Sequence, residues 1–192
     1  MGRPKKFDPD VAVDRAMDVF WRKGYGGTTP QDLVDALGIG KGSLYNTFGS
    51  KHALFEAALK RYRDSQATAL VEMLERPGPV KERLRNVLRL LCEMDLSDPD
   101  QRGCMAVNTA AELGRADESA AELVRRMLDR SEDAFRALVE EGQRAGEIDA
   151  GRDARAIGSL LANTVVGMRL LARVADGPDR LYRVIDGVVD SL

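Results

Sequence analysis

The feature that most restricts the fold of this chain is the spacing of its apolar residues. This spacing follows the period of an α-helix in almost every segment, and almost no segment alternates apolar and polar residues as a strand does. The seven prolines stand where a helix begins or where a loop runs. The pattern therefore predicts an all-α protein of about nine helices.

The first helices of this prediction begin at clear capping signals. Asp8 and Thr29 each precede a proline, which is tolerated in the first helical position because its missing N–H is not needed there. Gly24 and Gly38 are expected to end these two helices, and a third short helix is expected over 41–48. Ser50 caps a fourth, long helix that meets no stop before residue 76. The remaining helices are expected over 80–94, 103–113, 117–145, 152–174 and 179–191.

The charges are distributed unevenly along the chain. The 192 residues carry 29 Lys+Arg and 31 Asp+Glu, a net charge of -2, but residues 1–60 are net positive and the remainder is net negative. A mildly basic N-terminal part on an acidic body suggests a polyanion as partner of the former. A chance fluctuation explains the same numbers nearly as well.

Composition excludes several classes of protein. A hydrophobic fraction of 44% is too high for a disordered chain. We expect no membrane segment, because no apolar run approaches the roughly 18–20 residues that span a bilayer, and no signal segment follows the basic N-terminus. Cys92, Cys104 and His52 are too few for a disulfide framework or a four-ligand zinc site. These observations predict a cytoplasmic protein without a metal ion or cofactor.

The first 50 residues contain the pattern of a helix-turn-helix. Gly38 supplies the residue that tolerates a positive φ in the central turn, and Leu33, Leu37 and Leu44 stand where the two crossing helices must pack. The residues left on the outer side of the second of these helices are polar and lie on a helix short enough to enter a major groove: Lys41, Ser43, Tyr45, Asn46 and Thr47.

Residues 7–60 resemble the DNA-binding domain of the TetR family of transcriptional regulators. The resemblance is carried by Phe20, Lys23-Gly24-Tyr25, Thr28-Thr29, Asp32-Leu33, Gly38-Ile39, Lys41-Gly42-Ser43-Leu44-Tyr45, Phe48, Ser50-Lys51 and Leu54-Phe55. It implies a helix-turn-helix domain, placed here at 1–55 with a basic arm at 1–7, joined by the long helix to a helical effector-binding and dimerisation domain at 56–192. Val34, Gly40 and Thr47 depart from the family's usual residues, and because Thr47 lies on the reading helix, the operator sequence does not follow by analogy.

Residue chemistry and the resemblance together indicate which side chains contact double-stranded DNA. Lys41 and Lys51 supply charges for the backbone, Thr29 stands at a positive helix end, and Asn46 is a candidate for reading base edges. The basic arm either lies in the minor groove or is an inert, solvated tail. The full predicted set is Arg3, Lys5, Lys6, Thr29, Gln31, Lys41, Gly42, Ser43, Tyr45, Asn46, Thr47 and Lys51.

The last two helices point to a homodimer. The segment 152–174 is apolar on most sides, so it must bury one face in its own core and another against a partner. A two-fold dimer whose helices pair into a four-helix bundle explains this pattern, and the resemblance implies the same. The residues predicted for the interface are Gly158, Leu161, Val165, Met168, Leu181, Ile185 and Val188.

The middle helices are predicted to enclose a pocket for an unidentified small molecule. Asn108 and Asn163 are the most informative candidates, because an amide on a largely apolar helix face needs a partner. Cys104 is either a reactive thiol near a helix start or an inert buried cysteine. The candidate pocket residues are Met94, Cys104, Met105, Asn108, Thr109, Glu112, Met127, Phe135, Asn163 and Met168, and most methionines and phenylalanines at this spacing are ordinary core.

The sequence thus predicts a ligand-responsive DNA-binding regulator, acting as a repressor that a small molecule releases from a pseudo-palindromic operator. One alternative is a dimeric small-molecule-binding or adaptor protein without specific DNA recognition. The other is a small helical enzyme, which is disfavoured because the chain has one histidine and no glycine-rich phosphate loop.

Overall fold

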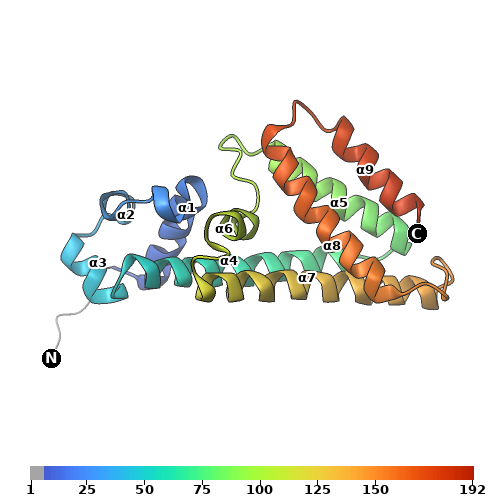
Figure 1. Ribbon diagram of the computed structural model, residues 1–192, viewed down its shortest axis with the longest axis horizontal. Coiled ribbons are helices and arrows are strands. Elements are labelled where there is room, and N and C mark those ends of the chain that lie inside the picture. Colours follow the sequence, from blue (N-terminus) through green and yellow to red (C-terminus); the bar gives the residue numbers. More distant parts are fainter. Residues whose placement is uncertain (1–6) are drawn as a thin grey trace.

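The computed structural model describes residues 7–192, in which the chain forms nine α-helices, one short 3-10 turn and no strand (Figure 1). The α-helices are α1 (Pro9–Gly27), α2 (Pro30–Leu37), α3 (Lys41–Phe48), α4 (Lys51–Leu74), α5 (Val80–Leu96), α6 (Met105–Leu113), α7 (Glu118–Arg144), α8 (Ala154–Leu171) and α9 (Asp179–Asp190), and the 3-10 turn η1 is Ala172–Val174. The prediction of an all-α fold of about nine helices is confirmed. Arg3, Lys5 and Lys6 of the predicted arm lie outside the described residues.

The helices begin where the capping signals predict. Oδ1 of Asp8 accepts a hydrogen bond from the backbone N–H of Asp10 at 2.9 Å, and Oγ of Ser50 accepts one from Ala53 at 3.0 Å. One helix end differs from the prediction. At Gly24 the backbone leaves the helical conformation, with φ 72° and ψ 174°, but a further turn continues to Gly27. The glycine therefore kinks α1 and does not end it.

Helices α1, α2 and α3 form a small head around the first half of α4. Phe20, Leu33, Leu44, Leu54 and Phe55 fill its core, each at most 2% exposed. Helices α2 and α3 have eight residues each, too few to be stable alone, so this packing holds them in place.

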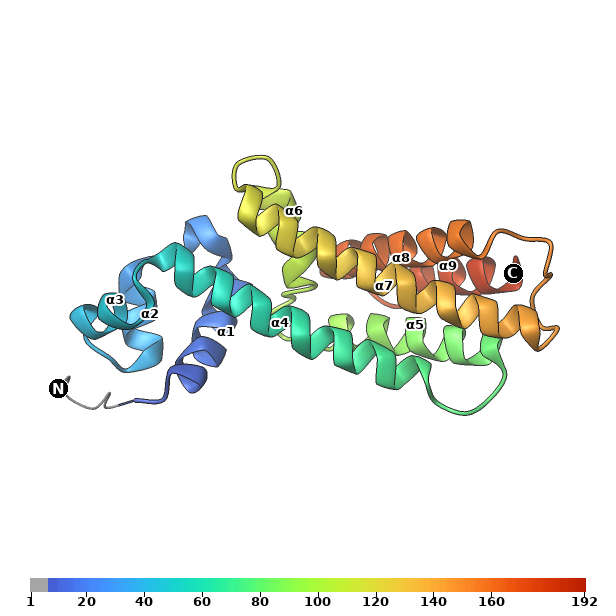
Figure 2. The same cartoon turned by 90° about the horizontal axis from the view of Figure 1, so that it is seen from below.

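The long helix α4 joins the head to the body and runs beside α7 (Figures 1 and 2). The buried residues form two clusters. The first contains the head core and continues through Tyr62 of α4 into Met105 of α6 and Val124 of α7. The head therefore shares its core with the body. The predicted domain border after residue 55 lies on α4, inside this first cluster.

The second cluster is the core of the body. Helices α5, α7, α8 and α9 bury Leu88, Phe135, Leu161 and Ile185, each 0% exposed. Contrary to the expectation from the sequence, residues 154–174 are long and apolar enough to cross a membrane by length and composition alone. Only 39% of that apolar segment is buried inside the chain, so much of its apolar surface has no cover within the protomer.

Candidate nucleic-acid interface and adjoining cavity

The turn between α2 and α3 has the geometry of a helix-turn-helix. Gly38 has φ 66° and ψ 30°, a left-handed conformation that glycine adopts without steric cost. The turn directs Leu33 of α2 and Leu44 of α3 into the head core. Because Leu44 faces inward, the opposite side of α3 is presented to solvent.

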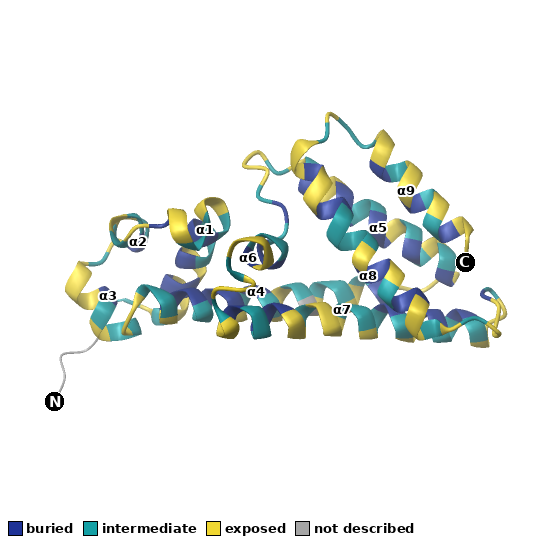
Figure 3. Ribbon diagram, viewed as in Figure 1, coloured by how far each residue is buried: buried dark blue, intermediate teal, exposed yellow. Residues whose placement is uncertain are grey.

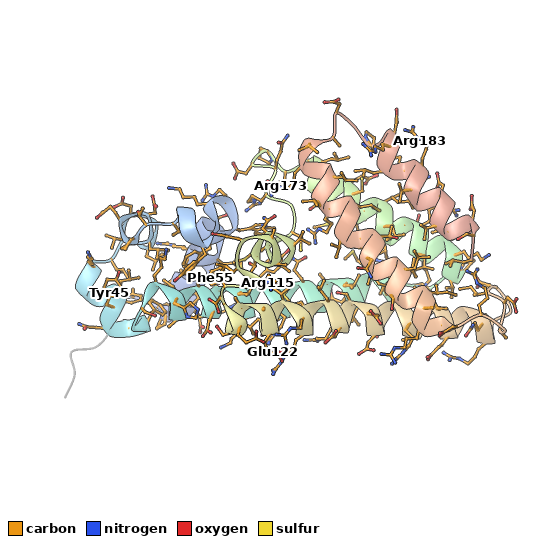
Figure 4. All side chains as sticks on the ribbon, viewed as in Figure 1. Tyr45, Phe55, Arg115, Glu122, Arg173 and Arg183 are labelled. Carbon is orange, nitrogen blue, oxygen red and sulfur yellow. The ribbon has the colours of Figure 1, made fainter. Side chains whose placement is uncertain are left out.

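The outer side of α3 is polar and is not used within the chain. The predicted DNA-contacting residues of this helix are all exposed or half-buried: Lys41, Gly42, Ser43, Tyr45, Asn46 and Thr47. In the described head, the side-chain hydrogen bonds reach Leu37 and resume at Ser50, so the residues of α3 make none. Tyr45 lies at the end of the head farthest from the body (Figure 4).

The exposed start of α2 is held by a capping box. The backbone N–H of Thr29 donates to Oδ2 of Asp32 at 2.8 Å, and the Thr29 hydroxyl accepts from the Asp32 N–H at 3.2 Å. Lys23 also donates to Asp32, and its hydrogen bond, with those from Thr29, holds the pKa of Asp32 well below its usual value. Gln31 donates to Asp35 one turn later. Both predicted residues, Thr29 and Gln31, are exposed on α2.

Lys51 has a structural role that the sequence did not indicate. Its Nζ donates to the carbonyl oxygens of Tyr25 and Thr28 at 2.9 and 3.0 Å, and it lies 4.2 Å from the centre of the Tyr25 ring. These contacts tie the start of α4 to the end of α1, and they leave one N–H of the ammonium group for another acceptor.

The described chain begins beside the C-terminal end of α3. The ring of Phe7 lies 6.5 Å from the ring of Phe48, the last residue of α3. The predicted basic arm therefore joins the structure next to the reading helix.

One joint between head and body is made by Glu112 of α6. Its carboxylate accepts hydrogen bonds from the backbone N–H groups of Tyr25 and Gly26 at 2.9 and 2.5 Å. Gly24 permits this approach, because a Cβ at that position would lie 2.7 Å from Oε2 of Glu112. Glu112 was predicted to line the pocket, but its carboxylate faces the end of α1.

A second joint connects α4 to the start of α7. Nε2 of His52 lies 2.6 Å from Oδ2 of Asp117, the N-cap residue of α7. The hydrogen bond from the backbone N–H of Ala120, with those from Ser119 and His52, lowers the pKa of Asp117 to about 2.

A third joint runs through the loop between α5 and α6. Nε1 of Trp21 donates to the carbonyl oxygen of Gly103 at 2.9 Å. Arg102 stacks over the Trp21 ring at 4.4 Å and donates to Asp18 of α1 and Asp98 of the loop, both at 2.9 Å. These contacts bind α1 of the head to the α5–α6 loop of the body.

A cavity of about 100 Å³ lies in the body next to this third joint. Its lining comes mainly from α4, α6, α7 and α8: Tyr62, Arg63, Gln66, Leu70, Val71, Met73, Leu91, Cys104, Ala106, Val107, Met127, Leu128, Arg130, Ser131, Ala134, Phe135, Ala162, Val165, Val166 and Arg169. Three of the predicted pocket residues are among them, namely Cys104, Met127 and Phe135.

The other predicted pocket residues lie elsewhere. Met105, Thr109 and Met168 are buried in the core, and Met94 is 50% exposed on α5. The amide of Asn108 donates to the carbonyl of Arg102 and accepts from Arg173, whose position near the α5–α6 loop is seen in Figure 4. Asn163 donates to the carbonyl of Ser159 on its own helix. The amide nitrogens of both asparagines thus donate to backbone carbonyls, and the Asn108 oxygen accepts from a side chain, so neither amide faces the cavity.

Two polar residues of the cavity, Tyr62 and Arg169, were missed by the sequence analysis. The hydroxyl of Tyr62 donates to Sγ of Cys104 at 3.5 Å and accepts from the Met105 N–H at 3.3 Å. Arg169 makes a two-point ion pair with Asp95, at 2.8 and 2.9 Å, and both residues are buried. Arg169 is the one charged residue in 156–172, and a charge within so apolar a stretch requires a buried partner.

The predicted dimer residues are used mainly inside the protomer. Leu161, Leu181 and Ile185 are at most 1% exposed, and Met168 is 3% exposed. Gly158 allows α8 to approach α7, because a Cβ there would lie 3.1 Å from the Cβ of Arg136. Val165 lines the cavity, and Val188 is half-buried against the body core. Leu161, Leu181, Ile185 and Met168 are therefore packed in the protomer's own core, whereas Val165 and Val188 stay partly open.

A different side of the same helices is apolar and exposed. We call this set the α8–α9 face: Leu160, Leu170, Leu171, Val174 and Val184, between 37% and 79% exposed. Figure 3 shows exposed and buried residues alternating along α8 and α9. Gly167 lies on the same side of α8, and a Cβ there would have no atom of this chain within 4 Å.

The chain matches two protein-family models. Residues 12–58 match the family described as "Bacterial regulatory proteins, tetR family", and residues 81–188 match "Tetracyclin repressor-like, C-terminal domain". The two models together cover the head and most of the body.

Full-length relatives show the same similarity. The chain is 35% identical over 188 residues to the HTH-type transcriptional regulator YezE of Bacillus subtilis, covering 97% of this chain and 96% of YezE. It is 29% identical to the HTH-type transcriptional repressor ComR of Escherichia coli, covering 95% and 88%. Among solved structures it is similar to a cysteine mutant of the regulator CifR complexed with 26-base-pair operator DNA, with a TM-score of 0.85, 31% identity and 99% of each chain covered.

Proposed function

The chain belongs to the TetR family of bacterial regulatory proteins, and we propose that it is a homodimeric repressor that a small molecule releases from its operator. Members of this family are transcriptional regulators that bind operator DNA and not enzymes. The observation that carries the proposal is the polar side of α3. It is exposed at the outer end of the head, while Leu44 on the opposite side of the helix packs in the head core. We place the protein in the cytoplasm, where bacterial operators are.

In the proposed complex α3 enters the major groove. Gly42 lets the helix approach the DNA closely, since a Cβ there would meet no atom of this chain within 4 Å. Ser43, Asn46 and Thr47 face the base edges, and an amide such as Asn46 is the strongest discriminator among them because it pairs with adenine at two points. Tyr45 contacts a thymine methyl group with its ring or a phosphate with its hydroxyl.

Contacts to the DNA backbone position the head. Lys41 at the start of α3 and the exposed N-terminus of α2, with Thr29 and Gln31, face phosphates on either side of the groove. Lys51 offers its remaining N–H to a phosphate while it holds α4 to α1. The arm with Arg3, Lys5 and Lys6 reaches the minor groove from its origin beside α3.

Dimerisation is proposed through the α8–α9 face. Its exposed leucines and valines are costly to leave in water, and pairing with a second copy across a two-fold axis removes them from it. The side chain of Asn163 lies on the same side of α8, and its carbonyl oxygen remains available to a partner. Two heads fixed in this way read two halves of a pseudo-palindromic operator.

The cavity is positioned to control the head. Tyr62 lines the cavity, and its ring packs edge to face against Trp21 of α1 at 4.9 Å. Cys104 also lines it and directly follows Gly103, which holds the indole of Trp21. A molecule that enters the cavity displaces these groups and shifts α1, so the two reading helices no longer match successive major grooves.

A footprinting experiment tests this function. We expect genomic fragments captured by the purified protein to contain a site that is protected from nuclease as two symmetrical halves about one helical turn apart. Equal binding to captured and random DNA would instead favour the alternative of a dimeric ligand-binding or adaptor protein without specific DNA recognition. An Asn46→Ala variant with unchanged sequence preference would remove that residue from base readout.

A further inference from the structure

The size of the cavity restricts the molecule that enters it. Its volume is about 100 Å³, whereas an apolar cavity of about 150 Å³ in another protein holds one benzene molecule. The enclosed space therefore takes roughly four or five carbon atoms. Any further part of the molecule must extend through the open side.

The floor and the rim of the cavity differ in exposure. Leu91, Phe135 and Ala162 of the lining are buried and form an apolar floor. Val71 of α4 and Leu128 of α7 are 39% and 37% exposed, so the rim lies between these two helices. A ligand is thus dry at its inner end and in contact with water at its outer end.

The charges along the lining are of one sign. Arg63, Arg130 and Arg169 line the cavity, and none of the lining residues is an aspartate or a glutamate. Two of the arginines have carboxylate partners: Arg63 pairs with Asp64 at 2.8 Å, and Arg169 pairs with Asp95. Arg130 is exposed, and within residues 7–192 it has no ion-pair partner within 4.0 Å. Arg130 on α7 helps to lower the pKa of the Asp64 carboxyl, but Arg63 holds that carboxyl, so among the described residues Arg130 is the one lining arginine without a direct carboxylate contact.

We propose that the effector is a small monocarboxylate, with a short apolar body in the cavity and its carboxylate at the rim on Arg130. This inference rests on the proposed function, because it names the effector of the same cavity. A carboxylate accepts a charge-assisted hydrogen bond from the guanidinium group and can remain partly hydrated there. A cation of the same size meets three guanidinium groups and no carboxylate on the lining, and a neutral molecule leaves the charge of Arg130 without a partner.

Three probes of one shape test the charge: hexanoate, 1-hexanol and hexylammonium. Each carries five carbons beyond the carbon that bears the polar group, which matches the enclosed volume, and calorimetric titration of the full-length protein gives the affinities. We expect hexanoate to bind about tenfold more tightly than 1-hexanol, and hexylammonium to bind more weakly than both. The fluorescence of Trp21, the single tryptophan, should change on binding because its ring contacts Tyr62. Hexanol or hexylammonium binding as tightly as hexanoate, or no binding of hexanoate, overturns the proposal.

Two arginine variants locate the charge. Arg130→Gln should remove the advantage of hexanoate over 1-hexanol, whereas Arg126→Gln should keep it. Arg126 is exposed on the same helix, does not line the cavity and pairs with Glu122. Equal effects of the two substitutions overturn the role of Arg130. Ala134→Leu, which fills the cavity from its wall, should weaken all three probes, and unchanged hexanoate binding in that folded variant places the site elsewhere.

Operator DNA added to the same titration distinguishes the proposed ligand class from the proposed regulation of DNA binding. Hexanoate that binds as predicted without releasing the DNA supports the ligand class and contradicts regulation through this cavity. A protein that binds its operator but ignores hexanoate keeps the proposed DNA recognition and loses the ligand class. Release of DNA by hexanoate from the wild type, and not from the Ala134→Leu variant, supports both.

Discussion

At the scale of single residues, two of the three joints between head and body contain a carboxylate that accepts backbone N–H groups. Glu112 receives two such bonds from the kinked end of α1, and Asp117 receives one at the start of α7. The first N–H groups of α7 have no acceptor within that helix, so Asp117 satisfies one of them with Oδ1 while its Oδ2 contacts His52 of α4. The head is therefore held at defined points and not by its shared core alone.

Replacing Glu112 by alanine should weaken this joint. The substitution leaves the N–H groups of Tyr25 and Gly26 to water, and we expect a loss on the order of 1 kcal/mol in the free energy of unfolding, measured by urea denaturation. Glu118→Ala is the matched control, because Glu118 is 84% exposed and contacts only Arg125. An equal loss in both variants would contradict the role of Glu112.

The low pKa of Asp117 predicts a pH dependence. Its value of about 2 in the folded chain lies below that of an aspartate in the unfolded chain, so the unfolded state takes up a proton first as the pH falls. The stabilisation by the charged form is present above about pH 4 and is lost as the pH approaches about 2. Wild type should exceed Asp117→Asn by on the order of 1 kcal/mol at about pH 5, and the gap should close at about pH 2.

The control for this titration is Asp129→Asn, an exposed position on the same helix. Urea denaturation at each pH measures the three proteins. A gap between wild type and Asp117→Asn that persists unchanged at about pH 2 would argue against the charge of Asp117 as its source.

The partners of polar residues are the part of the structure that the sequence predicts least well at this scale. Asn108 was predicted for the pocket because an amide on an apolar helix face needs a partner, and Glu112 was among the other candidates; both have partners within the chain. Asn108 is held by the carbonyl of Arg102 and by the side chain of Arg173, and Glu112 by the end of α1; Arg173 and α1 are far away in sequence, so no local pattern reveals them. The buried ion pair of Arg169 could have been predicted, because a lone charge in an apolar segment implies a buried counter-ion.

At the scale of elements, the reading helix α3 can be tested by two substitutions with different signatures. Lys41→Ala removes a charge facing the DNA backbone, so binding to all sequences should weaken alike. The slope of log affinity against log salt concentration should become shallower by about one unit. Asn46→Ala should cost about 1 kcal/mol or more, only at particular base pairs. Competition assays with operator variants at two salt concentrations measure both. A uniform loss for Asn46→Ala would contradict base reading by its amide.

The starts of the helices could be predicted from the sequence, but the side of a helix that is buried could not always be predicted. Thr29-Pro30 and Ser50 mark their helix starts through capping chemistry that is local, and the structure has the same starts. Helix α8 is apolar on most sides, so the spacing of its apolar residues does not show which side packs in the core of the protomer. Leu161 and its neighbour Leu160 are equivalent in composition, yet the first is buried and the second is 46% exposed. Only the packing of α8 on α7, through Gly158, decides between them.

At the scale of the whole molecule, the head and the helices α8 and α9 lie toward opposite ends of an elongated chain (Figures 1 and 2). The cavity lies between them and touches α1 through Tyr62 and Cys104. A displacement at the cavity can therefore change the distance between two heads only if their bodies are fixed to each other. The proposed response to a ligand thus requires the dimer.

The double substitution Leu170→Glu with Val174→Glu tests that requirement. These side chains are 50% and 79% exposed, so the change should spare the fold of the protomer while it places four carboxylates in the proposed two-fold contact. We expect a monomer in sedimentation experiments and at least a tenfold loss of operator affinity, because each head then binds alone. Val11→Glu is the control for oligomeric state, since Val11 is 47% exposed on α1, away from the α8–α9 face. A doubly substituted protein that remains a dimer would show that another surface joins the two copies, and the spacing of the reading helices would then have to be derived from that surface.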